Sequence, residues 1–199
     1  MSSYNLTPPR RITASNLPLP SNLRGDEHAE PGVEVKVDSL KADSLLDGTL
    51  MRSVVATSKQ IPTSNDGHGE LPLDKVPGMG IVLPGGLNMY YIDLAPNTEG
   101  TMHRTTSTDY LVLISGTLSL LTPAPEPYQV KDGAATYGEA VETVCHAGDV
   151  VAQRGMMHAL SNRTDVWVRL LAVVLSSDTN KVPIEGTGGY KELHDAWIG

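Results

Sequence analysis

The sequence has little cysteine, few aromatic residues and no long apolar run, and each shortage excludes a class of protein. Cys145 is the single cysteine in 199 residues, which excludes an intrachain disulfide and a cysteine-based zinc site. Aromatic residues make up 5% and phenylalanine is absent, so aliphatic side chains must fill most of the core. No run approaches the roughly 18 apolar residues that a transmembrane helix requires.

Basic residues are also scarce. Lys and Arg number 15 against 23 Asp and Glu, which gives a formal net charge of −8. A basic surface for nucleic acid and a polybasic membrane patch are therefore not expected. The first residues contain no apolar segment of the secretory type, so we expect a cytoplasmic protein without a membrane partner.

What the chain does contain is typical of an all-β protein. The 14 prolines and 19 glycines are scattered, as in turn-rich folds. Short β-type runs lie close together between these turn residues, and the most apolar, at 166–175, is expected to form a central strand. The predicted strands are 33–37, 50–57, 88–94, 110–114, 117–121, 141–145, 149–153, 157–160 and 166–175. This number of short strands favours a sandwich or barrel.

The length fits one domain with tails. Residues 1–32, rich in Pro, Ser and Asn, are predicted to form an extended arm, residues 33–180 the barrel, and residues 181–199 a tail. Short helices are expected over Ser44–Asp47 and around Lys191–Trp197. Ser115-Gly116 is expected to close a hairpin between two strands.

Two stretches carry the residues suited to chemistry. GTMHRTTSTDYLVLISG, from Gly100, places His103, Thr105 and Asp109 at strand positions of one parity. GDVVAQRGMMHALSN, from Gly148, places His158 shortly after a glycine turn. If the two stretches are neighbouring strands, these side chains can meet inside a barrel. Two histidines and one carboxylate with open positions form the pattern used by non-haem iron.

These stretches resemble the paired motifs of the cupin superfamily, and they are similar to a subgroup of small, single-domain fungal cupins. The resemblance covers roughly residues 85–176 and implies an all-β double-stranded β-helix, the jelly-roll barrel. In the subgroup the first motif likewise reads His-Arg-Thr followed by Asp-Tyr, which in this chain are His103-Arg104-Thr105 and Asp109-Tyr110. The matching motif residues are Gly100, His103, Asp109 and Gly116, then Gly148, Gly155, His158 and Asn162.

Three positions depart from the cupin pattern. Thr105 stands at the usual second histidine, Asp109 at the usual Glu, and Gln153 at the usual Pro. A hydroxyl is a poor ligand for a transition metal, so two alternatives stay open. Either His103, Asp109 and His158 hold one divalent metal such as Zn, Fe, Mn or Ni, or the site is metal-free.

The metal-free alternative still permits proton chemistry. His103 or His158 would act as the general base, and Asp109 would orient the imidazole or serve as the partner acid. Arg154 is a candidate for binding a substrate carboxylate. Further candidate substrate contacts are Thr105, Tyr91, Met157 and Arg104, although Arg104 also suits a structural ion pair.

The resemblance implies a secondary-metabolism enzyme. We expect a lyase or isomerase that decarboxylates, dehydrates or cyclises a polyketide-like or aromatic organic acid. The alternatives are an Fe(II)-type dioxygenase with a two-His, one-carboxylate site, and a non-catalytic ligand-binding cupin. Because cupins commonly pair sheets between subunits, the resemblance also implies a homodimer, with the N-terminal arm as a candidate contact.

Overall fold

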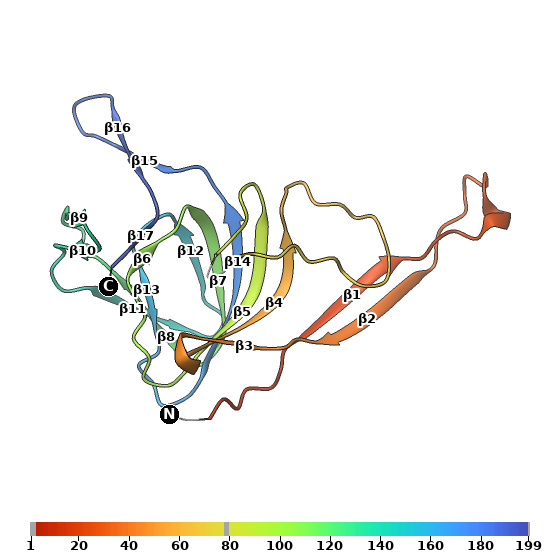
Figure 1. Cartoon of the computed structure of the whole chain (residues 1–199), viewed down its shortest axis with the longest axis horizontal. Coiled ribbons are helices and arrows are strands. Elements are labelled where there is room, and N and C mark those ends of the chain that lie inside the picture. The colour runs from red at the N-terminus through yellow and green to blue at the C-terminus, as the bar shows by residue number, and fades with distance from the viewer. Residues whose placement is uncertain (1–2, 78–79, 199) are drawn as a thin grey trace.

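The computed structural model describes residues 3–77 and 80–198 and is built almost wholly of β-strands (Figure 1). One sheet has six strands in the order β12-β7-β14-β5-β4-β3, and a second has three in the order β11-β8-β13. The bounds in the first sheet are Val150–Arg154, Ser107–Ser115, Val168–Ser176, Leu87–Leu94, Leu50–Ser58 and Asp43–Leu45. Those in the second are Val141–His146, Thr117–Thr122 and Ala159–Ser161. The predicted all-β, double-stranded β-helix fold is confirmed.

The core lies between the two sheets. In β14, burial alternates strictly, so that Val168, Leu170, Ala172 and Val174 face inward with at most 1% of their surface exposed. The predicted central position of this strand is confirmed, because β14 pairs with both β5 and β7. Aliphatic residues fill the space between the sheets, as the absence of phenylalanine requires.

The expected hairpin at Ser115-Gly116 is wrong. β7 and β8 are consecutive, but they belong to different sheets, so the chain crosses from one sheet to the other at Gly116. Gly116 has φ of 83°, and a Cβ atom there would lie 2.9 Å from Val168 Cγ2. Glycine therefore permits both the left-handed backbone and the close approach to β14.

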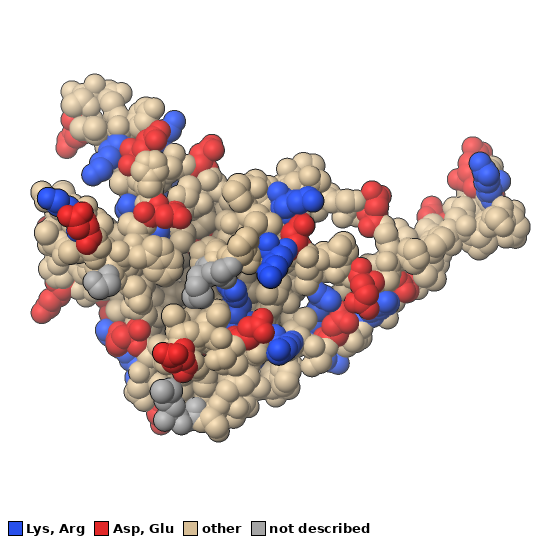
Figure 2. All heavy atoms as spheres, viewed as in Figure 1, with Lys and Arg blue, Asp and Glu red and all other residues tan. Residues whose placement is uncertain are grey.

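A two-stranded ribbon extends away from the barrel (Figure 1). It consists of β1 (Arg10–Asn16) and β2 (Val33–Ser39), with a short 3-10 helix, η1 (Ser21–Leu23), near its far end. The strand predicted at 33–37 is present, but it pairs with the arm instead of the barrel. Acidic and basic residues are interspersed along the ribbon and over the face of the barrel seen in Figure 2.

The N-terminal segment is fixed to the outside of the barrel by one ion pair. Arg169 donates from Nε and Nη2 to the two carboxylate oxygens of Asp93, each at 2.7 Å. The Tyr4 hydroxyl donates to Asp93 Oδ2 at 2.6 Å, and Arg169 Nη1 donates to the Thr7 carbonyl at 2.8 Å. Because Asp93 lies directly opposite Arg169 on neighbouring strands, the pair joins β5, β14 and residues 4–7.

Both predicted helices are wrong. Residues 43–48 form the short strand β3 and a 3-10 turn, η2 (Leu46–Gly48), because β3 pairs with the edge of the barrel sheet at β4. The described C-terminal residues form β15 (Asn180–Pro183), β16 (Tyr190–Leu193) and β17 (Ala196–Trp197). β17 pairs with β6 (His103–Arg104), so tertiary contacts override the local helical pattern. The remaining strands are β9 (Val130–Lys131) and β10 (Ala134–Ala135).

No helix in residues 3–77 and 80–198 has the length and apolar character needed to span a bilayer.

Candidate functional site

A cavity of about 320 Å³ opens between the sheets and is lined mainly by apolar side chains. Inward-facing residues of β4, β5, β7, β12 and β14 form its walls, and residues 98–101 with Trp197 close one side. A small number of polar groups converge on this apolar space, which is the usual composition of a small-molecule site. These polar groups include Arg52, Tyr90, His103, Thr105, Asp109, Gln153 and His158, and the rim adds Thr49, Thr98, Glu99 and Thr101.

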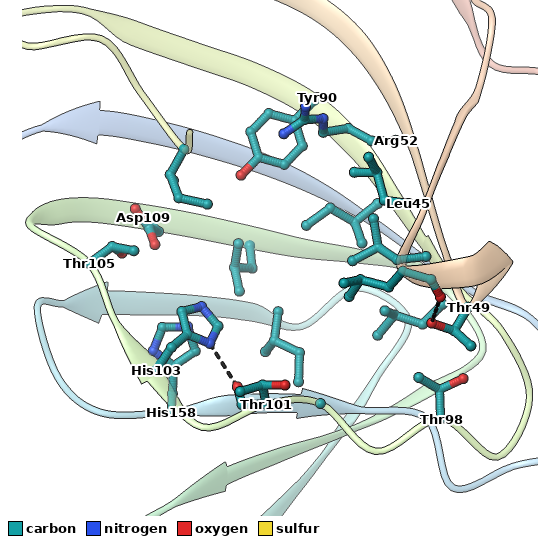
Figure 3. Close-up of a pocket in the computed structure, with 18 of the residues that line it drawn as sticks. Leu45, Thr49, Arg52, Tyr90, Thr98, Thr101, His103, Thr105, Asp109 and His158 are labelled. Carbon is teal, nitrogen blue, oxygen red and sulfur yellow. Dashed lines mark hydrogen bonds between the residues drawn. The ribbon is translucent and has the colours of Figure 1, made fainter. Parts of the chain in front are cut away.

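His103 and His158 lie side by side in this cavity (Figure 3). Each backbone N–H donates to the carbonyl of the other residue at 2.8 Å, so the two residues form a directly opposed antiparallel pair. Opposed residues of such a pair project to the same face. The ring centroids are accordingly 4.4 Å apart, with the ring planes tilted by 51°. The two sequence stretches thus meet inside the barrel as predicted.

The local hydrogen bonds give both imidazoles the same tautomer. His103 Nδ1 lies 2.8 Å from the Thr101 carbonyl, and His158 Nδ1 lies 3.0 Å from the Met156 carbonyl. A carbonyl only accepts, so each Nδ1 carries the proton in the neutral ring, and each Nε2 keeps its lone pair. Burial lowers the pKa of His103. Burial and the neighbouring His103 lower the pKa of His158 to about 4. Both rings are therefore neutral bases near pH 7.

The depressed pKa of His158 predicts a pH dependence of stability. Between pH 6.5 and 4 the unfolded chain protonates this histidine and the native chain does not. The free energy of unfolding therefore falls as the pH drops, by up to about 3 kcal/mol from this group. We expect His158→Asn to lack this part of the loss, since Asn has no group that titrates there. Urea unfolding at pH 7 and pH 4 measures the difference, with the exposed His146→Asn as control. An equal loss of unfolding free energy in the wild type and in His158→Asn would contradict this prediction.

Asp109 projects into the cavity from β7, beside Thr105 (Figure 3). It is 6% exposed, and burial raises the pKa of its carboxyl group while the neighbouring Ser107 hydroxyl opposes the rise. Thr105 Oγ1 is 2.9 Å from Ser107 Oγ. The prediction that Asp109 shares the inward face of the strand with His103 and Thr105 is consistent with its place in the cavity lining. The carboxyl group forms no hydrogen bond with either imidazole among the described residues, so it does not orient the rings.

Arg52 and Tyr90 are polar residues of the cavity that were not identified from the sequence. Arg52 of β4 and Tyr90 of β5 both line the wall, with the guanidinium carbon 5.7 Å from the centre of the Tyr90 ring. Burial raises the pKa of Tyr90, and the negative charge of Asp109 raises it further. Arg52 has no acidic partner within 4 Å in the described part of the chain. Neither residue belongs to a motif. They could have been predicted only by knowing which side of β4 and which side of β5 faces the cavity.

Trp197 is a third residue missed from the sequence. Its ring stacks on His103, with centroids 4.3 Å apart and planes 7° from parallel. Residues 194–198, which we call the C-terminal clasp, hold it there. Arg104 Nε donates to the His194 carbonyl at 2.8 Å, and Thr106 N and Oγ1 donate to Asp195 Oδ1 at 2.5 and 2.6 Å. The tail thereby contributes one wall of the cavity.

We expect Trp197→Leu to change the surroundings of His103 without unfolding the barrel. An aromatic pair contributes about 0.5–1.5 kcal/mol, so the free energy of unfolding should fall by about 1 kcal/mol. The stacked indole shields the imidazole, so the His103 Cε1 proton should move downfield in the NMR spectrum. Tyr190→Leu, an exposed aromatic in the preceding strand, serves as the control. An unshifted His103 resonance would show that the clasp does not hold Trp197 on the ring in solution.

The remaining sequence candidates lie off the cavity, and their predicted positions are corrected. Tyr91 faces outward, where its ring lies 5.6 Å from the Arg169 guanidinium carbon, because adjacent strand residues alternate and Tyr90 faces in. Met157 packs in a separate buried cluster with Met102, for the same reason of alternation next to His158. Arg104 holds the clasp, and Arg154 lines a shallow polar hollow outside the barrel.

The residues present do not assemble the predicted three-residue metal site. Across residues 3–77 and 80–198, no group of three or more His, Cys, Asp or Glu side chains is close enough to hold a metal ion. The two Nε2 atoms offer two nitrogen ligands. Asp109 lies on β7, whereas His103 belongs to β6. Within the described residues, His103, Asp109 and His158 are therefore not grouped as a three-ligand site, and metal binding itself stays a prediction.

Comparison with known proteins relates the chain to fungal biosynthesis proteins, although no protein-family model matches it. It is 32% identical over 115 residues to the phomopsin biosynthesis cluster protein D of Diaporthe leptostromiformis, covering 57% of this chain and 53% of that protein. It is 26% identical over 137 residues to the cupin-domain-containing oxidoreductase fogC of Aspergillus ruber, covering 67% and 59%. The chain thus aligns with little more than half the length of these relatives.

Solved structures of low sequence identity were also matched. A double-stranded β-helix protein of Klebsiella pneumoniae gives a TM-score of 0.41 at 15% identity, covering 74% of this chain and 87% of that one. The polyketide cyclase RemF of Streptomyces resistomycificus gives 0.44 at 11% identity, covering 80% of each. The expected resemblance to a fungal cupin is confirmed by the β-topology and by the cupin-domain relative.

Proposed function

We propose that this cupin is a small-molecule enzyme of secondary metabolism, a lyase or isomerase that moves a proton at a carbon next to a carbonyl group. One observation carries the proposal. His103 and His158 lie together in a mainly apolar cavity, each Nδ1 is bonded to a backbone carbonyl, and no described residue hydrogen-bonds to either Nε2. A neutral, fixed imidazole beside an apolar substrate space is the arrangement required of a general base.

The proton transfer needs no further reagent. His158 Nε2 takes the proton from the carbon, and the electron pair of that C–H bond passes into an enolate. In an isomerisation, the imidazolium returns the proton to another atom of the substrate. In a dehydration, the electron pair forms a carbon–carbon double bond, the carbon–oxygen bond at the next carbon breaks, and the leaving oxygen takes the proton and departs as water.

The weak basicity of His158 indicates the kind of substrate. An imidazole with a pKa of about 4 removes a proton efficiently only from an acidic C–H group, such as one between two carbonyls. Polyketide-like compounds contain such groups. Arg52 replaces Arg154 as the group that binds a substrate carboxylate, since it lines the cavity and no carboxylate among the described residues lies within 4 Å of it.

The relatives support the setting. One is described as a protein of the phomopsin biosynthesis cluster and another as a cupin-domain-containing oxidoreductase. We propose a fungal pathway of secondary metabolism as the setting of the chain, a small organic acid as its substrate and the cytoplasm as its location.

Deuterium exchange tests the proposal even though the product is unidentified. The purified chain is incubated in heavy water with a panel of 1,3-dicarbonyl and hydroxy-aromatic acids, and mass spectrometry follows deuterium uptake and loss of water or carbon dioxide. Uptake catalysed by the protein at the acidic carbon is the expected result. Binding of a panel member without exchange or product would contradict the enzyme and leave a non-catalytic ligand-binding cupin.

An oxidoreductase is the second candidate, favoured by the description of the Aspergillus ruber relative. It predicts that a panel member is consumed together with oxygen and that a chelator stops the reaction. An oxygen electrode measures this directly. Turnover that continues without oxygen and in the presence of EDTA would eliminate the dioxygenase and retain the lyase or isomerase.

We also propose that the chain forms a homodimer through the β1–β2 ribbon. One face of the ribbon exposes only apolar side chains over its middle, and Ile12, Val35 and Val37 are 62%, 61% and 54% exposed. The other face contacts residues 69–70 through Glu34 and Lys36. An isolated two-stranded ribbon is marginal in water, and a second copy supplies an identical apolar face that can cover it symmetrically.

We expect the double variant Ile12→Asp, Val35→Asp to be a monomer, because both charges would be buried in the dimer. Light scattering after size-exclusion chromatography measures the mass of wild type and variant. Lys36→Ala, on the opposite face of β2, should remain a dimer. A wild-type chain that is monomeric at every concentration would contradict the proposal.

A further inference from the structure

Two buried polar side chains face each other in the cavity wall. Asp109 of β7 and Gln153 of β12 are directly opposed in the antiparallel pair, and both line the cavity. They are 6% and 2% exposed. Within the described residues, Asp109 Oδ1, Gln153 Oε1 and Gln153 Nε2 are buried without any hydrogen-bond partner. The sequence marked Gln153 only as a departure at the usual proline of the second cupin motif.

Two other buried amides of the barrel have the hydrogen bonds that Gln153 lacks. Asn88 accepts from the Thr57 hydroxyl at 3.0 Å and donates to the Ile81 carbonyl at 2.8 Å. Asn162 Nδ2 lies within 3.1 Å of three backbone carbonyls, and its Oδ1 accepts from Thr164. In both side chains, the amide NH₂ group and the amide oxygen each have a hydrogen-bond partner. Gln153 is as deeply buried and makes none of these bonds, although leaving such a group unpaired destabilises the fold.

The unpaired atoms define what can bind. Gln153 presents one acceptor and one N–H donor side by side, and Asp109 Oδ1 adds a second acceptor. A complementary group needs two donors and one acceptor. A primary carboxamide has this set, because its C=O accepts from Gln153 Nε2 while one N–H donates to Gln153 Oε1 and the other to Asp109 Oδ1. A carboxylate has no donor and would be repelled by an ionised Asp109.

We propose that Asp109 and Gln153 form a carboxamide-binding subsite, so that the ligand of this cavity carries a primary amide group. The inference deepens the proposed function, and it rests on that function only for the assumption that this cavity is the substrate site. It assigns Asp109 to substrate binding and leaves proton transfer to the histidine pair. The two groups belong to different strand pairs, with Asp109 and Gln153 on β7 and β12 and the histidines opposed to each other (Figure 3).

Matched neutral probes test the subsite. Benzamide and acetophenone have nearly the same shape, but acetophenone carries a methyl group where benzamide has its NH₂. Ligand-observed NMR titration of the full chain at pH 7 gives the dissociation constant of each. We expect benzamide to bind about tenfold or more tightly, because acetophenone leaves two acceptors unpaired. Equal affinities, or no binding of either probe at millimolar concentration, would overturn the subsite and mean that the pair holds only water.

Variants assign the preference to the two side chains. Gln153→Met keeps the volume without polar atoms and should bind the two probes almost equally, and Asp109→Leu should reduce the ratio. Gln129→Met changes an exposed glutamine and should keep the wild-type ratio. An unchanged preference in Gln153→Met would overturn the assignment. Thermal unfolding checks that each variant is folded, and we expect Gln153→Met to melt no lower than wild type because it removes two unpaired polar atoms.

The outcome is separable from that of the proposed function. His158→Asn should retain the benzamide preference whether or not the protein is an enzyme. A wild-type chain that prefers benzamide but exchanges no proton would overturn the proposed chemistry and keep the subsite. A chain that exchanges protons and binds both probes equally would overturn the subsite and keep the proposed chemistry.

Discussion

We expect the His158→Asn variant to catalyse proton exchange about 10²–10⁴-fold more slowly than the wild-type protein. Asn places an amide N–H near the position of Nδ1, so it can keep the hydrogen bond to the Met156 carbonyl, but it has no Nε2. The variant therefore removes the base with little change to the backbone pair with His103. The measurement is the initial rate of deuterium uptake by a 1,3-dicarbonyl acid that the wild-type protein exchanges.

The surface histidine His146 provides the matched control. Its side chain is 70% exposed and is not among the residues that line the cavity, so His146→Asn should exchange at the wild-type rate. His103→Asn should also slow exchange, since the ring centroids are 4.4 Å apart and no described residue hydrogen-bonds to Nε2 of either ring. A His158→Asn variant that is folded and retains more than about a tenth of the wild-type rate would rule out this residue as the base.

The second large effect concerns stability. We expect Asp93→Ala to lower the free energy of unfolding by about 3–5 kcal/mol, because it leaves Arg169 largely buried without a counter-charge. The Asp93 side chain is 1% exposed and that of Arg169 is 12% exposed. The variant also removes the acceptor of the Tyr4 hydroxyl, so residues 4–7 should become more accessible to proteases. Urea unfolding at pH 7 measures the change.

Two further variants separate the buried pair from a simple loss of charge. Asp43→Ala removes a carboxylate that is 65% exposed and 4.0 Å from Lys41, and it should cost less than about 0.5 kcal/mol. The double variant Asp93→Ala, Arg169→Met should recover most of the stability lost in the single variant, because the unpaired charge is gone. A loss below about 1 kcal/mol in Asp93→Ala would show that the ion pair does not hold the N-terminal segment.

The pattern of the strands was largely readable in the sequence. Each predicted strand from 33 to 175 has a counterpart within a few residues, since the alternation of apolar side chains and the intervening glycines are local properties. The errors lie where the pairing partner determines the structure. Residues 191–197 have a helical pattern but form β16 and β17, and Ser115-Gly116 connects two sheets instead of closing a hairpin.

The candidate site was also predictable only in part from the sequence. The sequence was enough to predict that His103 and His158 would meet, because both stand in motifs on strands that become neighbours. The rest of the cavity required the folded chain. Arg52, Trp197 and the unpaired state of Gln153 depend on which side chains from distant segments face the same space. Tyr91 faces outward in the folded chain. The two consecutive tyrosines of β5 do not indicate which of them faces inward until the pairing of the strand is known.

The choice between a three-residue metal site and a histidine pair depends on where the side chains lie in the folded chain. His103, Asp109 and His158 belong to the paired motifs, yet the described residues contain no group of three or more His, Cys, Asp or Glu side chains that could hold a metal ion. Residue types and spacing follow from the chain alone. The separation of two strands within a barrel follows from packing contacts that the spacing does not encode.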